Sequence, residues 1–477
     1  MANTKSNYQA FYWNALERFG NQGIQFVIGI VLARILSPTD YGLVGLLLVF
    51  TAVAQIFIDS GFTKALIQRN DKSDDDLSTA FTSNLVIGLV IYVILWIAAP
   101  YIAAFYEEEV LKNLLRALSL ILIINALFAI PNTVLTIDLE FKTIAKINSV
   151  AVLVSGIVAI ILAMNGFGVW SLVLQYLLKA FITLILFTIK SPWKYRFYFS
   201  KSSFKTLFSF GSNLMASSLL NVIVSKFSSL FIAKVISTPD LGYYTRGIQF
   251  PDVAIGTLGS VLDTVLLPTL AKFKEPEKLK EQSKRVLELL SLLTIPITFL
   301  LAVLAEPIVL LLLTEKWINA VPILQLFCLS RFVTNLSSVN INLLYVINKP
   351  NLVLRQQYSK MAIRVALILI ALPFGIVYIA LAEVISSVIH FAINAYYPGK
   401  LLNFGLSSQL RIIGPYILIG SGIYILLFFI ERNLTSPIWE IPLISIIGIL
   451  LYAILINFLK KEEAAMVKGI IKDKLFR

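Results

Sequence analysis

Charged side chains inside long apolar stretches are the residues of this sequence that could do chemistry. A charged group at the centre of a lipid bilayer is unfavourable by about 2.5–3.5 kcal/mol, so it normally faces a cavity or pairs with a partner. The cations placed in this way are Arg18, Arg116, Lys179, Lys226, Arg331 and Arg364. The acids are Glu17, Asp59, Asp252, Asp263, Glu306 and Glu383. Because the two sets balance in number, counting alone does not predict a positively charged cavity.

Two interpretations of the cations stay open. Arg18, Lys226 and Arg331 lie well inside their apolar runs, where they could line a cavity and bind an anion. Guanidinium and ammonium groups suit this role because they donate charge-assisted hydrogen bonds to phosphate and carboxylate oxygens. Arg116, Lys179 and Arg364 are further candidates for the same role. In the alternative, the cations pair with Glu17, Asp59, Asp263 or Glu383 and fix helix packing.

The runs that carry these charges are long enough to cross a membrane. The sequence is 58% hydrophobic and 14% charged, against about 45–50% and about 25% in soluble domains. A span needs roughly 20 mostly apolar residues. Such runs fall at about 9–35, 41–65, 77–104, 110–136, 144–164, 167–189, 206–236, 246–271, 287–313, 319–347, 357–374, 376–398, 411–431 and 437–459. These predict fourteen transmembrane helices, and the division near Pro373 and Gly375 leaves twelve open.

The distribution of Lys and Arg predicts the orientation of the chain in the membrane. Basic residues gather in alternate loops and in the C-terminal tail, as the cytoplasmic loops of membrane proteins do. Both termini are therefore expected in the cytoplasm, which requires an even number of spans. This asymmetry also accounts for the net charge of +13. No stretch is long enough for a soluble basic domain, so we expect no nucleic-acid partner.

An internal repeat relates the two halves of the sequence. Residues 32–43 read LARILSPTDYGL and residues 232–243 read IAKVISTPDLGY. At an offset of 200, Ala33, Ser37, Asp40 and Gly42 recur as Ala233, Ser237, Asp240 and Gly242. Each copy ends a long run and opens a tight turn, where Pro and Asp preset the backbone and cap the next helix. Two copies in the same orientation predict parallel repeats, an arrangement used by alternating-access transporters.

Three segments carry a resemblance to a known family. They are the motif at residues 33–43, Asp59-Ser60-Gly61-Phe62, and Leu139-Glu140-Phe141-Lys142-Thr143-Ile144-Ala145. With them, the sequence resembles bacterial polysaccharide-export flippases of the Wzx-like, O-antigen and colanic-acid exporter type. These belong to the multidrug/oligosaccharidyl-lipid/polysaccharide superfamily. The family often has a Gly-x-x-Trp turn after the ninth helix, where this chain has Thr314-Glu315-Lys316-Trp317.

The resemblance implies an all-α membrane protein with two pseudo-symmetric six-helix lobes around a central cavity. The expected divisions are an N-terminal lobe at 1–200, a C-terminal lobe at 201–400, and two extra helices with a basic tail at 401–477. The implied substrate is an oligosaccharide linked to undecaprenyl pyrophosphate, moved from the inner to the outer leaflet of the bacterial cytoplasmic membrane for export of lipopolysaccharide or exopolysaccharide. Membrane lipids, a polysaccharide polymerase and its chain-length machinery are the other candidate partners. A monomer is the default expectation.

On this interpretation Arg18, Lys226 and Arg331 contact the pyrophosphate or acidic sugars, with Arg116, Lys179 and Arg364 as further candidates. Glu17 and Asp59 are candidates for coupling transport to a proton or cation, because intramembrane carboxylates often serve in that way.

Two other functional classes are alternatives to a polysaccharide flippase. The first is a cation-coupled antiporter of drugs or small solutes from the same superfamily, whose cavity would be more acidic. The second is a membrane enzyme such as a polymerase or glycosyltransferase, which usually carries a large loop or a soluble catalytic domain. The sequence has no HExxH pattern and no GxxxxGK[ST] loop. With one Cys and one His it offers no plausible zinc site. We therefore expect a transporter with no catalytic residues, no metal and no cofactor.

Overall fold

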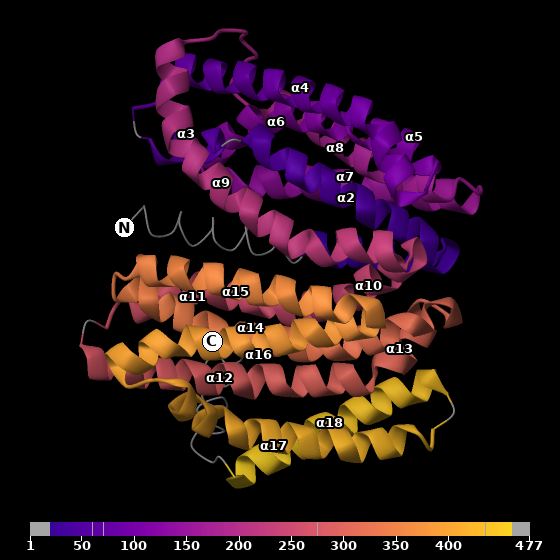
Figure 1. The fold of residues 1–477 in the computed structure, drawn as a ribbon, viewed down its shortest axis with the longest axis vertical. Coiled ribbons are helices and arrows are strands. Elements are labelled where there is room, and N and C mark those ends of the chain that lie inside the picture. The colour runs from indigo at the N-terminus through magenta and orange to yellow at the C-terminus, as the bar shows by residue number, and fades with distance from the viewer. Residues whose placement is uncertain (1–19, 60, 70, 274, 435, 460–477) are drawn as a thin grey trace. The chain divides into compact units, whose positions relative to one another are not determined.

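The computed structural model describes residues 20–59, 61–69, 71–273, 275–434 and 436–459, and this part of the chain is helical with no strand (Figure 1). Within it, twelve helices are long and apolar enough to cross a membrane. A helix at residues 20–35 and an interrupted helical stretch at 238–270 take the places of the two other expected runs. The all-α membrane architecture is therefore confirmed.

Contacts divide the chain into two compact units, Met1–Gly242 and Tyr243–Arg477. The first holds α2 (Pro38–Asp59), α3 (Phe62–Gln68), α4 (Asp74–Tyr106), α5 (Val110–Leu118), α6 (Leu120–Ile137), α7 (Phe141–Met164), α8 (Val169–Lys190), α9 (Lys201–Phe231), the π-helix η1 (Ile232–Ile236) and the start of α10 (Thr238–Pro251). The second holds the rest of α10, η2 (Asp252–Gly256), α11 (Thr257–Leu270), α12 (Pro276–Val303), α13 (Ala305–Leu312), η3 (Glu315–Ala320), α14 (Val321–Val346), α15 (Pro350–Ala371), η4 (Leu372–Phe374), α16 (Ile376–Leu402), α17 (Leu406–Glu431) and α18 (Pro437–Leu459). The expected lobe boundaries at residues 200 and 400 stay predictions.

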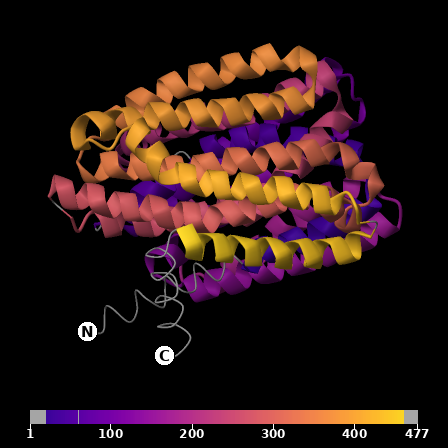
Figure 2. The ribbon, with the colours of Figure 1, turned by 90° about the horizontal axis from the view of Figure 1, so that it is seen from below.

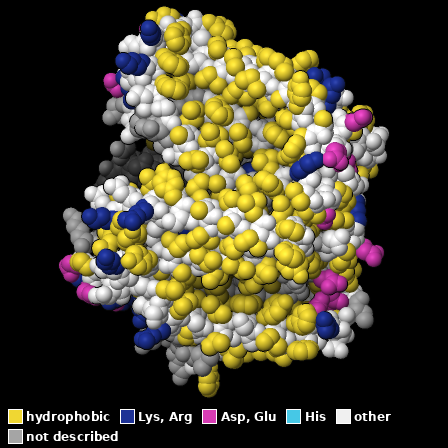
Figure 3. Space-filling view, viewed as in Figure 1, with side chains coloured by type: hydrophobic (Ala, Val, Ile, Leu, Met, Phe, Trp, Pro, Cys, Tyr) yellow, Lys and Arg dark blue, Asp and Glu magenta, His cyan; other side chains and the backbone are white. Residues whose placement is uncertain are grey.

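The surface of the helices fits a lipid environment. One face of α4 exposes Val86, Val90, Val93 and Ile97, each at least half accessible. Their spacing of three and four residues places them on one side of the helix. In Figure 3 hydrophobic side chains cover the middle of the visible face, whereas Lys, Arg, Asp and Glu side chains gather toward its left and right edges. This is the pattern expected where helices cross hydrocarbon and charges stay near the aqueous ends.

The two C-terminal helices pack on the second unit. Helix α17 lies against α12 and α18, and the three share one hydrophobic core. Tyr416 of α17 is fully buried there. Tyr452 of α18 donates a hydrogen bond of 3.1 Å to the carbonyl of Leu292 on α12. In the colours of the bar, α17 and α18 are the yellow helices in Figures 1 and 2.

Glycines with a positive φ divide one expected run and separate two others. The run expected at 41–65 is divided, because α2 ends at Asp59. At Gly61, which has a φ of 72°, the chain changes direction before α3 begins. A Cβ on Gly61 would overlap the backbone of Gly211 on α9, so both glycines allow α3 and α9 to touch. Between α15 and α16 the chain passes through η4 and Gly375, with φ of 100°. The division near Pro373 and Gly375 therefore separates two helices.

Both copies of the internal repeat form the same local structure. In the first copy, the Ser37 hydroxyl donates to the Asp40 carboxylate at 2.7 Å, and the Asp40 amide donates back to Ser37 at 3.2 Å. In the second copy, the corresponding distances between Ser237 and Asp240 are 2.5 and 3.1 Å. This reciprocal cap satisfies amide groups at the start of α2 and of α10.

The two copies also contact each other within the first unit. A Cβ on Gly42 would overlap the carbonyl of Thr238, and one on Gly242 would overlap the carbonyl of Pro38. Gly42 and Gly242, which recur in the repeat, therefore have to be glycines, because the first helical turn of the other copy lies directly against each of them. The first turns of α2 and α10 thus contact each other closely and reciprocally.

The acidic turn after α4 binds the second copy of the repeat. Lys234 donates to Glu107 at 2.8 Å, and the Thr238 hydroxyl donates to Glu108 at 2.6 Å. This hydrogen bond and the charge of Lys234 lower the pKa of the Glu107 carboxyl below its ordinary value. Glu107 therefore stays ionised, and keeps its ion pair, through the neutral and mildly acidic range.

Replacing Gly42 by alanine is expected to lower the free energy of unfolding by about 1–3 kcal/mol, because the added methyl group forces the crossing backbones apart. Gly242→Ala should do the same. Gly422→Ala is the matched control, since this helical glycine has open space around it and alanine there should be neutral or stabilising. Denaturant unfolding of the purified proteins in detergent measures all three. Wild-type stability of Gly42→Ala would contradict the close crossing.

The turn at Thr314 holds a strained backbone. Thr314 has φ of 84° and ψ of 168°, a region that is essentially restricted to glycine. It is the position at which the resembled family often has glycine. The turn leads to Trp317, whose side chain is fully buried. The Trp317 amide donates a hydrogen bond of 3.1 Å to the Thr314 carbonyl.

We expect Thr314→Gly to raise the free energy of unfolding by about 1 kcal/mol, because it relieves this strain. The same change at Thr334, inside α14, should lower it by a similar amount. Unfolding of both variants in the same detergent provides the comparison. If Thr314→Gly were less stable than the wild type, the strain assigned to this turn would be wrong.

Candidate functional site

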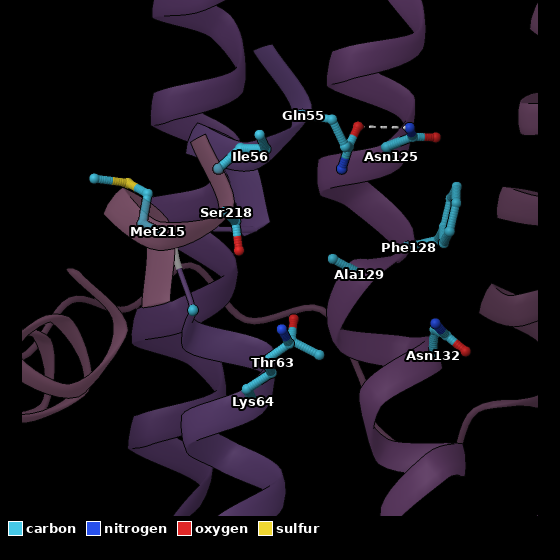
Figure 4. A pocket seen from close by; sticks show the side chains of 11 residues that line it. Gln55, Ile56, Thr63, Lys64, Asn125, Phe128, Ala129, Asn132, Met215 and Ser218 are labelled. Carbon is cyan, nitrogen blue, oxygen red and sulfur yellow. Dashed lines mark hydrogen bonds between the residues drawn. The ribbon is translucent and has the colours of Figure 1, made fainter. Parts of the chain in front are cut away.

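A cavity of about 340 Å³ with a partly polar lining lies in the first unit. Helices α2, α3, α6 and α9 form its walls (Figure 4). Its polar lining consists of Gln55, Thr63, Lys64, Asn125, Asn132 and Ser218. In Figure 4 the labelled side chains of α6 line the side opposite Met215 and Ser218 of α9. Among the residues whose side chains the structure describes, no acidic one lines this cavity.

Three amide side chains give the cavity its hydrogen-bonding character. Asn125 donates to Gln55 at 2.8 Å, which links α6 to α2. Asn132 lies seven residues further along α6, so it projects from the same side of the helix. The span that carries both runs from Val110 to Ile137, with Asn125 near its middle. Amides at this depth line a protein interior or an aqueous route, because lipid offers them no partner.

Lys64 is the cation among the described residues that line this cavity. It is exposed and forms no hydrogen bond or ion pair within the residues that the structure describes. The break at Gly61 redirects the chain into α3, which carries Lys64 beside the cavity. An unpaired ammonium group next to several amides can bind a phosphate and sugar hydroxyls together.

Helix α9 extends the polar lining away from the cavity. Ser218 lies in the cavity wall, and Ser225 and Ser229 follow at the spacing of one helical face. Lys226, predicted to bind substrate, is exposed on the neighbouring part of this helix and forms no ion pair within the described chain. Serines and an exposed lysine at membrane depth indicate an aqueous surface rather than a lipid-facing one.

Arg331 lies in an ion pair within the second unit. Its guanidinium contacts the Asp252 carboxylate in η2, and it lies 5.5 Å from the centre of the Phe327 ring. One turn further along α14, Asn335 donates to the carbonyl of Ile255 at 2.9 Å. The π-helix η2 is thus attached to α14 by two contacts. This geometry supports a packing role for Arg331, and its predicted contact with substrate stays untested.

Arg364 likewise forms an ion pair in the second unit. Its Nε and one terminal nitrogen donate to the same oxygen of Glu383, at 3.1 and 2.8 Å. The Glu383 side chain is only 8% exposed. Lys360, also buried, lies one turn before Arg364, and its carbonyl is 2.9 Å from Nε2 of His390. The ion pair of Arg364 with Glu383 therefore joins α15 to α16, close to the buried Lys360.

Arg116 and Lys179 do not line the cavity, and the side chains of the remaining predicted residues are not described. Arg116 stacks on Trp96, 3.8 Å from the ring centre, and donates to the Trp96 carbonyl. Lys179 is partly buried in α8 and forms no ion pair within the described chain. Arg18 and Glu17 lie outside the described residues, as does the side chain of Asp59. Their predicted roles in binding and coupling therefore stay predictions.

Comparison with known proteins decides the family. Residues 31–322 match the family described as polysaccharide biosynthesis protein, which is more than half of the chain. The chain belongs to this family. The family resemblance inferred from the repeat motif and its two supporting segments is confirmed.

Characterised relatives of this family member act in the synthesis of different surface polysaccharides. The teichuronic acid biosynthesis protein TuaB of Bacillus subtilis is 26% identical over 434 residues, 90% of each chain. The succinoglycan biosynthesis transport protein ExoT of Rhizobium meliloti is 27% identical over 69% of this chain and 67% of its own. The lipopolysaccharide biosynthesis protein WzxC of Escherichia coli is 27% identical over 66% of this chain and 65% of its own.

Solved transporters share the fold. The lipid II flippase MurJ in an inward closed conformation aligns with a TM-score of 0.76 and 17% identity, over 94% of this chain and 99% of that one. An inward-facing multidrug resistance transporter of the MATE family aligns with a TM-score of 0.60 and 14% identity, over 81% and 96%. These likenesses show the fold of this polysaccharide biosynthesis protein.

The cavity of this family member was not predicted from the charges. Its lining depends on Gln55, Asn125 and Asn132, which are neutral, and on Lys64, which follows an unexpected helix break. The signal that could have found it is the presence of amides inside strongly apolar runs. Among the described residues, no three His, Cys, Asp or Glu side chains gather in a way that could hold a metal ion.

Proposed function

We propose that this chain is a flippase that moves an oligosaccharide linked to undecaprenyl pyrophosphate from the inner to the outer leaflet of the bacterial cytoplasmic membrane. The cargo serves the export of a surface polysaccharide, and the mechanism is alternating access. No chemical bond is made or broken in this process, so the protein needs to bind the headgroup, shield it from hydrocarbon and release it.

The observation that carries the proposal is the cavity of the first unit. A sugar headgroup presents hydroxyl groups, which pair with amides such as Asn125 and Asn132. A pyrophosphate presents negative oxygens, which pair with an ammonium group such as Lys64. Lys226 offers a second cation further along α9. The cavity thus supplies the two kinds of contact that one amphipathic cargo requires.

The names of the relatives support the same cargo class. They describe the biosynthesis of three different products, teichuronic acid, succinoglycan and lipopolysaccharide. A carrier that serves such different polymers is expected to recognise the shared lipid phosphate strongly and the sugars through adaptable hydrogen bonds. A lysine beside several amides fits that requirement.

The proposal is tested in cells depleted of the protein. Lipid extraction should show accumulated undecaprenyl-linked oligosaccharide, while the surface polysaccharide falls. Re-expression of the wild-type chain should restore both quantities. Unchanged lipid pools combined with a new sensitivity to cationic drugs would overturn the proposal in favour of a cation-coupled multidrug antiporter.

A further inference from the structure

A second hollow lies on the second unit, between α15 and α16, with a volume of about 540 Å³. On α16 its wall consists of two parallel rows at four-residue spacing: Val388, Ala392 and Tyr396, and Ile389, Ile393 and Tyr397. Val388 and Tyr396 are 50% and 61% exposed, so the hollow is an open groove. None of its residues takes part in the polar cavity of the first unit.

The groove changes character along its length. Its apolar rows extend over eight residues of α16, about 12 Å at 1.5 Å per residue. Each row ends in a tyrosine, close to the end of α16 at Leu402. Tyrosines are enriched at the level where hydrocarbon meets the lipid headgroups. The groove is therefore apolar toward the middle of α16 and polar where α15 begins and α16 ends.

Arg355 of α15 gives the polar end a positive charge. It is the sixth residue of α15, it is exposed, and it forms no hydrogen bond or ion pair within the described chain. The adjacent Gln356 donates its side-chain amide to the carbonyl of Ile393, which fixes α15 against α16 below this charge. A cation above a rigid apolar groove is complementary to a molecule with an anionic head and an aliphatic tail.

We propose that this groove binds one anionic glycerophospholipid of the surrounding bilayer, with its phosphate at Arg355 and an acyl chain along the two rows of α16. The tyrosine hydroxyls at the polar end provide hydrogen bonds to the headgroup. A polyprenyl pyrophosphate fits less well, because it brings more negative charge than Arg355, the one cation among the described residues that line the groove, can balance. The site is thus a resident lipid site, separate from the transport cavity.

Native mass spectrometry of the full-length protein, with phosphatidylglycerol, phosphatidylcholine or a polyprenyl pyrophosphate added, tests the proposal. The wild type should retain one phosphatidylglycerol in preference to phosphatidylcholine. Arg355→Gln should weaken this retention about fivefold, the loss expected for one cation near an anionic headgroup. Arg411→Gln is the matched control, because Arg411 is likewise the exposed sixth residue of its helix, α17, and does not line the groove.

Ala392→Trp tests the apolar part independently, because the indole fills the groove and should abolish retention without changing charge. Arg355→Lys should keep it. Three results would overturn the proposal: wild-type retention by both Arg355→Gln and Ala392→Trp, equal retention of phosphatidylcholine, or preferential retention of the polyprenyl pyrophosphate. No oligosaccharide enters the experiment, so its outcome does not depend on the transport proposal.

Discussion

Replacing Arg364 by leucine is expected to lower the free energy of unfolding by about 3 kcal/mol. The change removes both guanidinium hydrogen bonds from the Glu383 carboxylate, whose side chain is only 8% exposed. Breaking a buried ion pair from one side is strongly destabilising because the remaining charge keeps its desolvation penalty. Denaturant unfolding in detergent measures the effect, with Arg411→Leu as the control at an exposed arginine.

The double variant Arg364→Leu with Glu383→Leu separates packing from substrate binding. Replacing a whole buried pair by apolar side chains is often neutral or stabilising, so the double variant should recover most of the lost stability. If Arg364 serves packing alone, polysaccharide export should recover as well. A stable double variant that exports no polysaccharide would show that the guanidinium has the substrate role predicted for it. A single variant as stable as the wild type would contradict the structural role.

The architecture could be predicted because lipid imposes a simple rule on the sequence. Every span must be apolar over its length and satisfy its own backbone hydrogen bonds, so helix positions follow directly from hydropathy. Breaks within helices follow from local backbone conformation instead. The sequence contains Gly61 and Gly375, but only the structure shows the positive φ that makes each of them a break. Pro251 ends α10, but the helical backbone continues directly into the π-helix η2.

The repeat illustrates how sequence can predict local structure without predicting its partner. Pro and Asp in each copy predicted a turn and a helix cap, and in both copies the Asp forms the cap together with a serine that the prediction did not single out. The recurrence of glycine at Gly42 and Gly242 had no explanation from local geometry alone. Its reason is the crossing of the two copies, which brings together residues 200 positions apart. A contact at this sequence distance cannot be derived from the composition of either segment.

The site was harder to predict because charge alone does not show which cations are accessible. Arg331, Arg116 and Arg364 each have a protein partner in the structure. Lys64 has none within the described chain, and it lies beside the amides of the cavity. A membrane cation that is paired stabilises packing, whereas one that faces a cavity can bind a ligand. The sequence contains the charges, and only the fold shows which of them have partners.

Removing the charge of Lys64 is expected to lower polysaccharide export at least about tenfold. A hydrogen bond to a charged group contributes about 1.5–3 kcal/mol, and one factor of ten corresponds to about 1.4 kcal/mol. Lys64→Gln removes that contact and keeps most of the side chain, whereas Lys64→Arg should keep most of the export. Lys146→Gln is the matched control, because Lys146 is an exposed lysine near the start of α7 and does not line the cavity. Surface polysaccharide and undecaprenyl-linked oligosaccharide are measured at equal protein abundance. Wild-type export by Lys64→Gln would exclude this lysine from the transport site.

The amide pair of the cavity gives a second, independent test of the same site. Asn125→Leu removes the hydrogen bond to Gln55, so it should reduce both stability and export. Gln55→Leu combined with Asn125→Leu replaces the pair by apolar contacts and should restore stability. If the amides only hold α2 to α6, export returns with stability. If they bind sugar hydroxyls, the stable double variant still accumulates lipid-linked oligosaccharide, because a leucine wall cannot replace the hydrogen bonds that the headgroup makes in water.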